Sequence, residues 1–147
     1  MARTKHYMNW KSCTIVHGSG PTTISLTEIT NVEFMINDEF VQFKGDGNIY
    51  ATVMALANST RGVRITSADL GRLSVTIPHN TPCTVTVICH DVVNGAGDGA
   101  LTFVLANALK QTIAPGGAQN VILTDTVTFM SYSSDGTTSP LTISEDS

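Results

Sequence analysis

The sequence predicts an all-β protein, an antiparallel β-sandwich or barrel with one short α-helix. Residues 83–108 contain two long apolar, threonine-rich runs joined by the segment NGAGDG, which is a strong β-hairpin pattern. Shorter runs elsewhere alternate apolar and polar residues, and clusters of Gly, Pro, Asn and Asp separate them. One stretch alone, after Ser67, carries the signals of a helix start.

The hairpin at residues 83–108 is the feature around which the other elements are expected to assemble. Thr, Val and Ile crowd its first arm, and the three glycines of its connecting segment permit the positive φ angles of a tight turn. At about 3.3 Å per residue each arm is ~30 Å long, which is more than a small domain covers on both faces. We therefore expect a neighbouring molecule to cover part of it.

The other strands are expected to be separated by turns, and the last of them, at residues 120–132, is expected to be a third long strand. Their ranges are 13–17, 22–29, 32–36, 39–44, 49–57, 63–67 and 120–132. Asn37 and Asp38 are expected to form a two-residue turn, and residues 45–48, 58–62 and 111–119 to form loops. Ser67 can cap a helix of about two turns that ends before Pro78, with Asp69 in the first turn, where the helix dipole favours a carboxylate.

The chain length of 147 residues fits one domain with two terminal segments. Residues 1–12 are expected to be an N-terminal arm that orders against a partner, with Trp10 as its one large anchor. Residues 13–132 form the predicted β-sandwich domain. Residues 133–147 form a C-terminal tail that has too few apolar residues to pack by itself.

The composition points to assembly. The chain is 41% hydrophobic but only 14% charged, below the ~25% of average soluble domains, so part of its surface is expected to be buried between subunits. A net charge of −4 argues against a protein that grips a phosphate backbone. No apolar run has the length of a signal peptide's core or a membrane helix, so we expect a soluble protein with no membrane partner.

No catalytic or ligand-binding pattern is recognisable. The three cysteines, at 13, 83 and 89, do not form a disulfide framework and are expected to be reduced and buried. None of the four histidines has a second ligand at zinc spacing, and no pair of carboxylates is placed for acid–base work. We therefore expect no enzyme activity, no metal and no cofactor.

Several segments in order resemble one known family. They are FKGDG at residues 43–47 before an apolar strand, ITSADL at 65–70, GAGDG at 95–99, and Thr128-Phe129 in a closing strand that runs into residues 132–141. This order, over residues 32–141, is similar to that of the tail tube proteins (major tail proteins) of tailed bacteriophages.

The resemblance implies a structural virion protein. Six copies would close into a ring, and rings would stack into a tail tube, assembled in the host cytoplasm with other tail proteins, through which DNA passes without specific binding. Asp91, Asp98 and Asp125, on or beside the long strands, are candidates for the channel wall. The N-terminal arm and residues 45–61 would contact neighbouring subunits or the next ring, with these candidate residues: Trp10, Gly45, Asp46, Gly47 and Arg61.

Three other functions compete with that of a tail tube protein. A capsid decoration (cement) protein of a phage head is also a small β-sandwich, but it does not need long channel strands. A carbohydrate-binding module typically presents several exposed aromatic rings, whereas this chain has one Trp and three Tyr. A hydrolase or nuclease is opposed by the missing acid–base and metal constellations.

Overall fold

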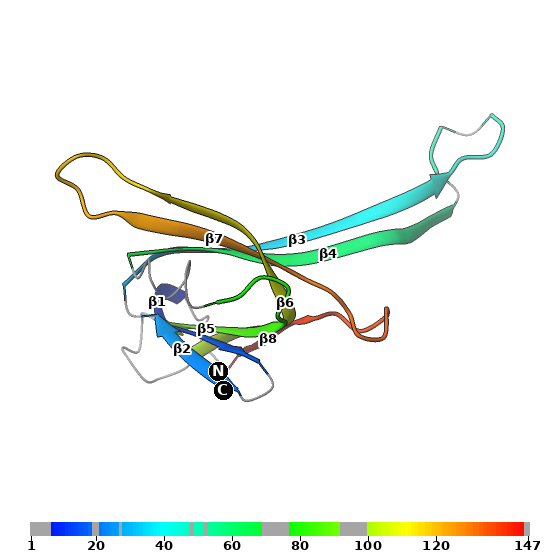
Figure 1. The fold of residues 1–147 in the computed structure, drawn as a ribbon. Helices are drawn as coiled ribbons and strands as arrows, with labels where there is room; N and C mark the ends of the chain where they lie inside the picture. Colours follow the sequence, from blue (N-terminus) through cyan, green and yellow to red (C-terminus); the bar gives the residue numbers. More distant parts are fainter. Residues whose placement is uncertain are drawn as a thin grey trace, which may run out of the picture.

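A computed structural model describes residues 7–18, 21–26, 28–47, 49–51, 53–68, 77–91 and 100–145, and these residues form an all-β fold (Figure 1). The strands are β1 (Tyr7–His17), β2 (Thr22–Leu26), β3 (Ile29–Phe43), β4 (Val53–Ser67), β5 (Cys83–Asp91), β6 (Ala100–Gly116), β7 (Thr124–Ser131) and β8 (Leu141–Glu145). Every strand pair is antiparallel, as predicted. Most of the predicted helix falls at residues 69–76, outside the described residues, and Ser67 itself ends β4.

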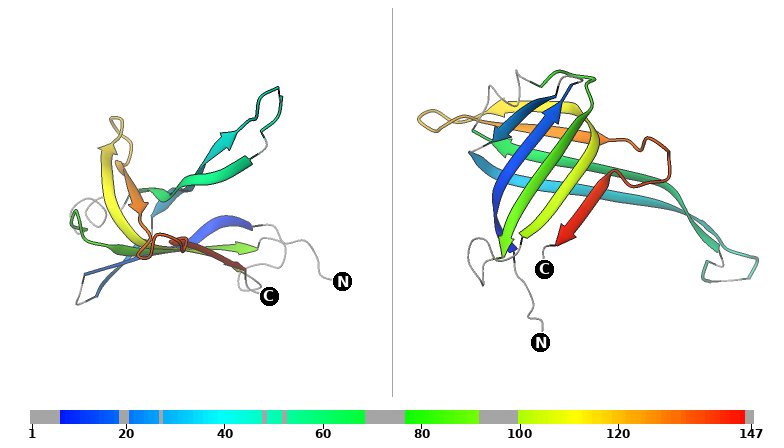
Figure 2. Two further views of the ribbon diagram at one scale, coloured as in Figure 1. Left: turned by 90° about the vertical axis from the view of Figure 1, so that its right-hand side faces the viewer. Right: turned by 90° about the horizontal axis from the view of Figure 1, so that it is seen from below.

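Strand β6 belongs to two layers. Its first part pairs with β5 and β8, and its last part, from Ala108 to Gly116, pairs with β7. The strand order β2-β1-β5-β6-β7-β4-β3 therefore folds into a β1 layer (β2, β1, β5, the first part of β6, and β8) and a β4 layer (the last part of β6, β7, β4 and β3). The strands of the two layers run in clearly different directions (Figure 2).

The bend of β6 is made at Asn107, which has a positive φ of 53°. Asparagine tolerates this left-handed conformation better than most residues, and the ladder with β5 shifts register at the same place. The C-terminal segment provides partners for the backbone there: the Ala106 N–H donates to the Pro140 carbonyl at 2.9 Å, and the Tyr132 N–H donates to the Asn107 carbonyl at 3.3 Å.

The core lies between the two layers and is built from alternate residues of the strands. Its buried members are Cys13, Ile15, Ile24, Leu26, Val32, Val63, Ile65, Ile77, Cys83, Val85, Val87, Leu105, Ala108, Val127 and Phe129. The three cysteines are free and buried, which confirms the prediction for them, and burial raises the pKa of Cys13 to about 12. The Cys13 thiol therefore stays protonated at neutral pH.

The expected turn at Asn37 and Asp38 is wrong. Both residues lie inside β3 and pair with Thr60 and Ser59, so the expected loop at residues 58–62 is also wrong and belongs to β4. The two strands form one long ribbon that projects from the body (Figure 1). Asn37 and Asp38, which are common turn residues, are extended here because they pair with residues of β4.

The predicted hairpin at residues 83–108 is confirmed in its arms, since β5 and β6 pair antiparallel. Its connecting segment, including Asp98, lies outside the described residues. The loop expected at residues 111–119 is only partly correct, because β6 continues to Gly116 through Pro115. Pro115 is tolerated because the last part of β6 is paired on one side only, with β7.

Both terminal segments contribute strands to the β1 layer. Residues 7–12, expected in the N-terminal arm, form the first part of β1 and pair with β5 around a bulge at Asn9 (φ 64°). Residues 141–145, expected in the C-terminal tail, form β8 and pair with β6. The Tyr7 hydroxyl donates a hydrogen bond to the Glu145 carboxylate, which ties the two strands together.

Candidate functional site

The β4 layer has one face against the core and a second face that is polar. Side chains on this polar face come from alternate residues of β3, β4 and β7, and neighbouring strands place them in rows. Arg64 forms an ion pair with Glu33 at 3.4 Å, and the hydroxyls of Thr66 and Thr126 share a hydrogen bond of 2.9 Å. The polar face thus presents hydroxyl groups and one ion pair.

An apolar row crosses the polar face where β4 and β7 approach closely. Met35, Gly62, Met130 and Leu109 stand level on the four strands. A Cβ built on Gly62 would lie 2.6 Å from Met130 Sδ and 3.1 Å from Met35 Cε, so the two methionine side chains meet over the glycine. Only glycine leaves room for them there.

The β4 layer has two unpaired edges among the described residues. β3 pairs with β4 alone, and the last part of β6, Leu109 to Gly116, pairs with β7 alone. Edge strands carry unsatisfied backbone N–H and C=O groups and are templates for pairing with another chain. The layer is therefore an open sheet with two edges available for pairing.

The outer half of the β3–β4 ribbon exposes apolar side chains on both faces. Phe40 pairs with Leu56 on one face and Val41 with Ala55 on the other, beyond the reach of the core. The exposed large apolar residues of the ribbon are Ile36, Phe40, Val41, Phe43, Ile49, Tyr50, Met54 and Leu56. An apolar surface of this extent on a projection is typical of an interaction site.

A polar cluster holds the ribbon where it leaves the body. One Arg61 nitrogen donates to Asp38 Oδ1 at 2.8 Å, to the Ser59 hydroxyl at 2.7 Å and to the Thr60 carbonyl at 2.9 Å. The Ser59 hydroxyl also donates to Asp38, and these two hydrogen-bond donors hold the pKa of Asp38 below its ordinary value. Arg61, expected at a subunit contact, is thus engaged within its own chain.

The loop at residues 133–140 lies beneath this cluster and leaves a groove of about 220 Å³ against the ribbon. Asp135 organises the loop: its carboxylate accepts hydrogen bonds from the Thr138 hydroxyl and from the N–H groups of Thr137 and Thr138. These donors hold the pKa of Asp135 well below its ordinary value. The loop therefore presents a fixed negative charge on the surface.

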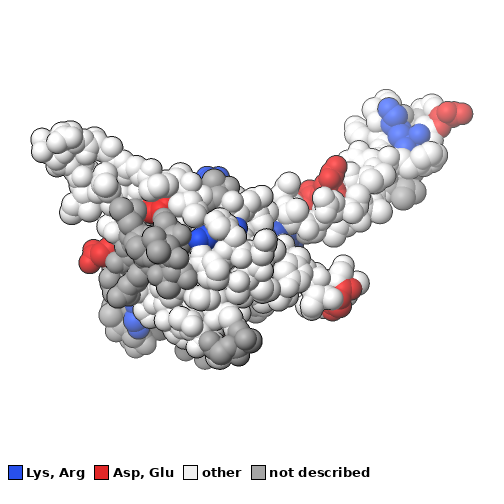
Figure 3. Space-filling model, in the orientation of Figure 1, with Lys and Arg blue, Asp and Glu red and all other residues white. Residues whose placement is uncertain are grey.

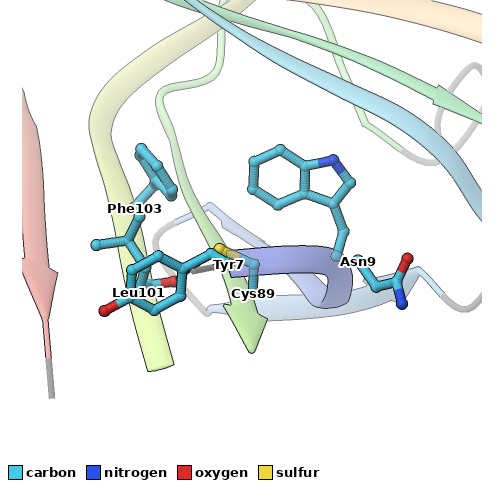
Figure 4. A pocket seen from close by; sticks show the side chains of 6 residues that line it. Tyr7, Asn9, Cys89, Leu101 and Phe103 are labelled. Carbon is cyan, nitrogen blue, oxygen red and sulfur yellow. Dashed lines mark hydrogen bonds between the residues drawn. The ribbon is translucent and has the colours of Figure 1, made fainter. Parts of the chain in front are cut away.

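Trp10, expected as the anchor of an arm that orders against a partner, packs against rings of its own chain. Its ring lies 6.4 Å from that of Phe34 and 5.8 Å from that of Phe103, while Phe34 and Phe103 stack at 4.5 Å. Beside this cluster an open, mainly apolar cavity of about 320 Å³ is lined by Tyr7, Asn9, Trp10, Cys89, Leu101 and Phe103 (Figure 4). The indole thus bridges the two layers.

Asp125 does not line a polar surface. It shares the core face of β7 with Val127 and Phe129 and is 0% exposed. Burial raises the pKa of Asp125, and the nearby N–H groups of Ala114 and Thr126 and the Lys110 ammonium offset the shift only in part. The expectation that Asp125 lies in a channel wall is therefore corrected, because its side chain is fully buried.

Lys110 is the second buried charged residue of the core face. Its ammonium donates a hydrogen bond to the Ile77 carbonyl, and burial lowers its pKa, although Asp125 and Cys83 act in the opposite direction. Two buried groups of opposite charge in one core each reduce the free-energy cost of burying the other. They are structural elements of the interior.

The other predicted site residues fall at strand ends and at one tip. Asp91 is the last residue of β5, and Asp98 lies outside the described residues. Gly45, Asp46 and Gly47 lie at the tip of the β3–β4 ribbon, where Gly47 has a positive φ of 74°. Asp46 and Gly47 are exposed.

The sequence reasoning missed Glu33, Arg64 and Thr126 on the polar face and residues 121–123 at the β6–β7 tip. The alternation of Thr124, Thr126 and Thr128 with buried residues was the available signal for the polar face. The described residues contain no group of three or more His, Cys, Asp or Glu placed to hold a metal ion. A search of the same part of the chain finds no helix with the length and apolar character needed to cross a membrane.

No protein-family model matches the sequence, and no curated protein is significantly similar to it. Solved structures do share its fold. A chain of the six-fold symmetrised baseplate of the anti-feeding prophage has a TM-score of 0.57 and 10% identity, over 99% of this chain and 95% of that chain. A chain of the sheath–tube complex of an extracellular contractile injection system (PVC), in the extended state, has a TM-score of 0.55 and 11% identity, over 91% and 87%.

A chain of the cap that terminates the anti-feeding prophage tube gives a TM-score of 0.56 and 10% identity, over 98% of this chain and 94% of that chain. At such low identity the likeness concerns the fold. This chain therefore has the all-β fold found in components of phage-tail-like particles, and the match runs over nearly the whole length of both chains.

Proposed function

We propose that this chain is a structural subunit of a phage-tail-like tube, in which copies close into a ring around a channel. The observation that carries the proposal is the β4 layer: a sheet with one polar face and two edges that no other described strand pairs with. Closing such sheets edge to edge pairs both edges of the β4 layer and turns the polar face toward a common space.

The strand directions favour this closure. The β4 layer has four strands, and neighbours alternate in direction. A rotation about an axis roughly along the strands therefore places β3 of one copy antiparallel to β6 of the next. Barrels require neighbouring strands to be staggered, and the layer is already staggered, because its two hairpins extend in opposite directions.

The polar face suits a channel through which DNA moves without being held. Its charged residues on the body of the layer, Glu33 and Arg64, neutralise each other. Threonine hydroxyls and a net charge of −4 on the whole chain provide no grip on a phosphate backbone.

Six copies per ring is the number that we propose, supported by the shared fold with a chain of a six-fold symmetrised baseplate and with a chain of a tube-terminating cap. The tip residues Gly45, Asp46 and Gly47 are proposed to contact neighbouring copies. In this proposal the protein is part of the particle's tail, assembles with other tail proteins in the host cytoplasm, and has no enzymatic role.

Negative-stain electron microscopy of the purified chain, with mass measurement by light scattering, tests the proposal. Hollow tubes or rings of six copies, about 94 kDa for a 15.6 kDa chain, are the expected result. Trimers, or a monomer that coats phage capsids, would overturn it in favour of a capsid decoration protein.

A further inference from the structure

The most exposed large apolar side chains of the described residues lie on two hairpin tips. Ile49 and Tyr50, each 83% exposed, follow the β3 end of the β3–β4 ribbon, and Ile122, 78% exposed, lies in the connection between β6 and β7. Neither tip has a core beside it. Single exposed apolar residues are ordinary, but two hairpin tips that each gather exposed apolar side chains require an explanation.

The two tips point in opposite directions along the β4 layer. Ala108, Ser131, Arg61 and Ile36 stand level on the four strands. From this level, one tip lies beyond Phe43 and the other beyond Gly116, at the opposite end of the strands (Figure 1). The tips therefore cannot meet within one molecule.

The β6–β7 tip has a defined shape. The Val121 N–H donates to the Ala118 carbonyl at 3.2 Å, and Asn120 adopts a positive φ of 64°. Leu123 lies so close over Gly117 that a Cβ there would be 2.6 Å from Leu123 Cδ2. The turn thus holds Ile122 on the outside before any partner binds, which lowers the entropic cost of docking.

The β6–β7 tip is also free of charge. No charged residue occurs from Gln111 to Thr124, and Figure 3 shows this projection without a charged side chain on the visible face. The β3–β4 tip carries Lys44 and Asp46, but its outermost apolar residues, Ile49 and Tyr50, follow them. The chemistry that fits the β6–β7 tip is an uncharged, apolar surface.

We propose that the β6–β7 tip of one copy docks against the β3–β4 tip of a second copy in the next ring, with Val121 and Ile122 against Ile49 and Tyr50. This inference rests on the proposed tube function and names the contact by which rings stack. Because the tips lie at opposite ends, a translated copy brings them together, and the contact repeats without closing. A two-fold dimer joined end to end would bring each tip only to its own counterpart.

The test uses charge substitutions at side chains that the isolated fold does not bury. In Ile122→Asp, a carboxylate replaces the apolar contact, and single rings without stacks are expected by negative-stain microscopy and light scattering. Tyr50→Lys is expected to give the same loss. The double variant Ile122→Asp/Tyr50→Lys sets opposite charges against each other across the contact, and we expect it to restore stacks at low salt.

Ile143→Asp is the matched control, because Ile143 is exposed on β8, far in sequence from both tips, and receives the same substitution. It is expected to form tubes like the natural chain. Circular dichroism and melting temperature confirm that each variant is folded.

Tubes formed by either single variant would overturn the docking inference and leave the tube function intact. A double variant that stays unstacked would overturn the pairing of these two tips, as would stacking lost equally in the Ile143→Asp control. A natural chain that forms neither rings nor tubes, or only discrete dimers, would instead contradict the proposed function itself.

Discussion

Gly62 is the position where the close approach of β4 and β7 can be tested most directly. In Gly62→Ala the added Cβ would lie 2.6 Å from Met130 Sδ, 3.1 Å from Met35 Cε and 2.8 Å from the Phe129 carbonyl oxygen. The methionine side chains can move, but the carbonyl belongs to the β4–β7 ladder. Overpacking of this kind costs about 1–3 kcal/mol.

For a chain of 147 residues, 1 kcal/mol corresponds to about 3 °C in melting temperature, so Gly62→Ala is expected to lower it by about 3–10 °C. Thermal unfolding followed by circular dichroism measures the change. Gly116→Ala is the matched control, because a Cβ there meets nothing within 4 Å. It is expected to leave the melting temperature unchanged or slightly higher, since alanine reduces the entropy of the unfolded chain.

A further variant separates the two contacts at Gly62. Adding Met130→Ala to Gly62→Ala relieves the contact with sulfur and leaves the contact with the Phe129 carbonyl. A double variant no more stable than the sum of the two single changes would show that the methionine is not what resists the Cβ. If Gly62→Ala melts like Gly116→Ala, the close approach of the two strands is wrong.

Three further predictions concern the core and two carboxylates. Phe129→Ala removes a fully buried ring and is expected to cost about 3–5 kcal/mol in urea unfolding; a cost below 1 kcal/mol would contradict its place in the core. Because the folded state raises the pKa of Asp125, protonation of this residue stabilises the fold fully below the unfolded pKa of about 4. This stabilisation is lost as pH rises through the folded pKa. Asp125→Asn should abolish the loss in a series of unfolding curves measured at different pH values. The lowered pKa of Asp135 has the opposite sign: its contribution is present above about pH 4 and is lost as pH falls through the folded pKa. Asp135→Ala should remove that acid-side loss, and an unchanged pH profile would contradict the hydrogen bonds to the loop.

The sequence was least informative along the β3–β4 ribbon. Asn37 and Asp38 are common turn residues, and their neighbours fit two short strands as well as one long strand. A strand is recognised in a sequence when apolar residues alternate with polar ones because one face is buried. The outer part of β3 is exposed on both faces, so its sequence does not show this alternation. Its continuity is decided instead by the pairing of Asn37 with Thr60 and Asp38 with Ser59, which lie more than twenty positions away.

The candidate site was predictable only in part for the same reason. Alternation along residues 124–131 places Asp125, Val127 and Phe129 on one face, as in the structure, but it does not reveal that Asp125 is fully buried. The polar, mixed residues around Trp10 favour an arm that orders against a partner. In the fold, Phe34 and Phe103 from two other strands pack against Trp10 instead.

The sequence by itself determined the all-β class, the pairing of the two arms at residues 83–108, the buried reduced cysteines and the shortage of surface charge. These features depend on side-chain period and composition, which are local. The tertiary structure alone decided that β6 bends at Asn107 and joins two layers, that the β4 layer has two open edges, and that two apolar tips point apart. Those features depend on contacts between residues distant in the chain, because pairing with neighbouring strands decides where each strand bends and ends.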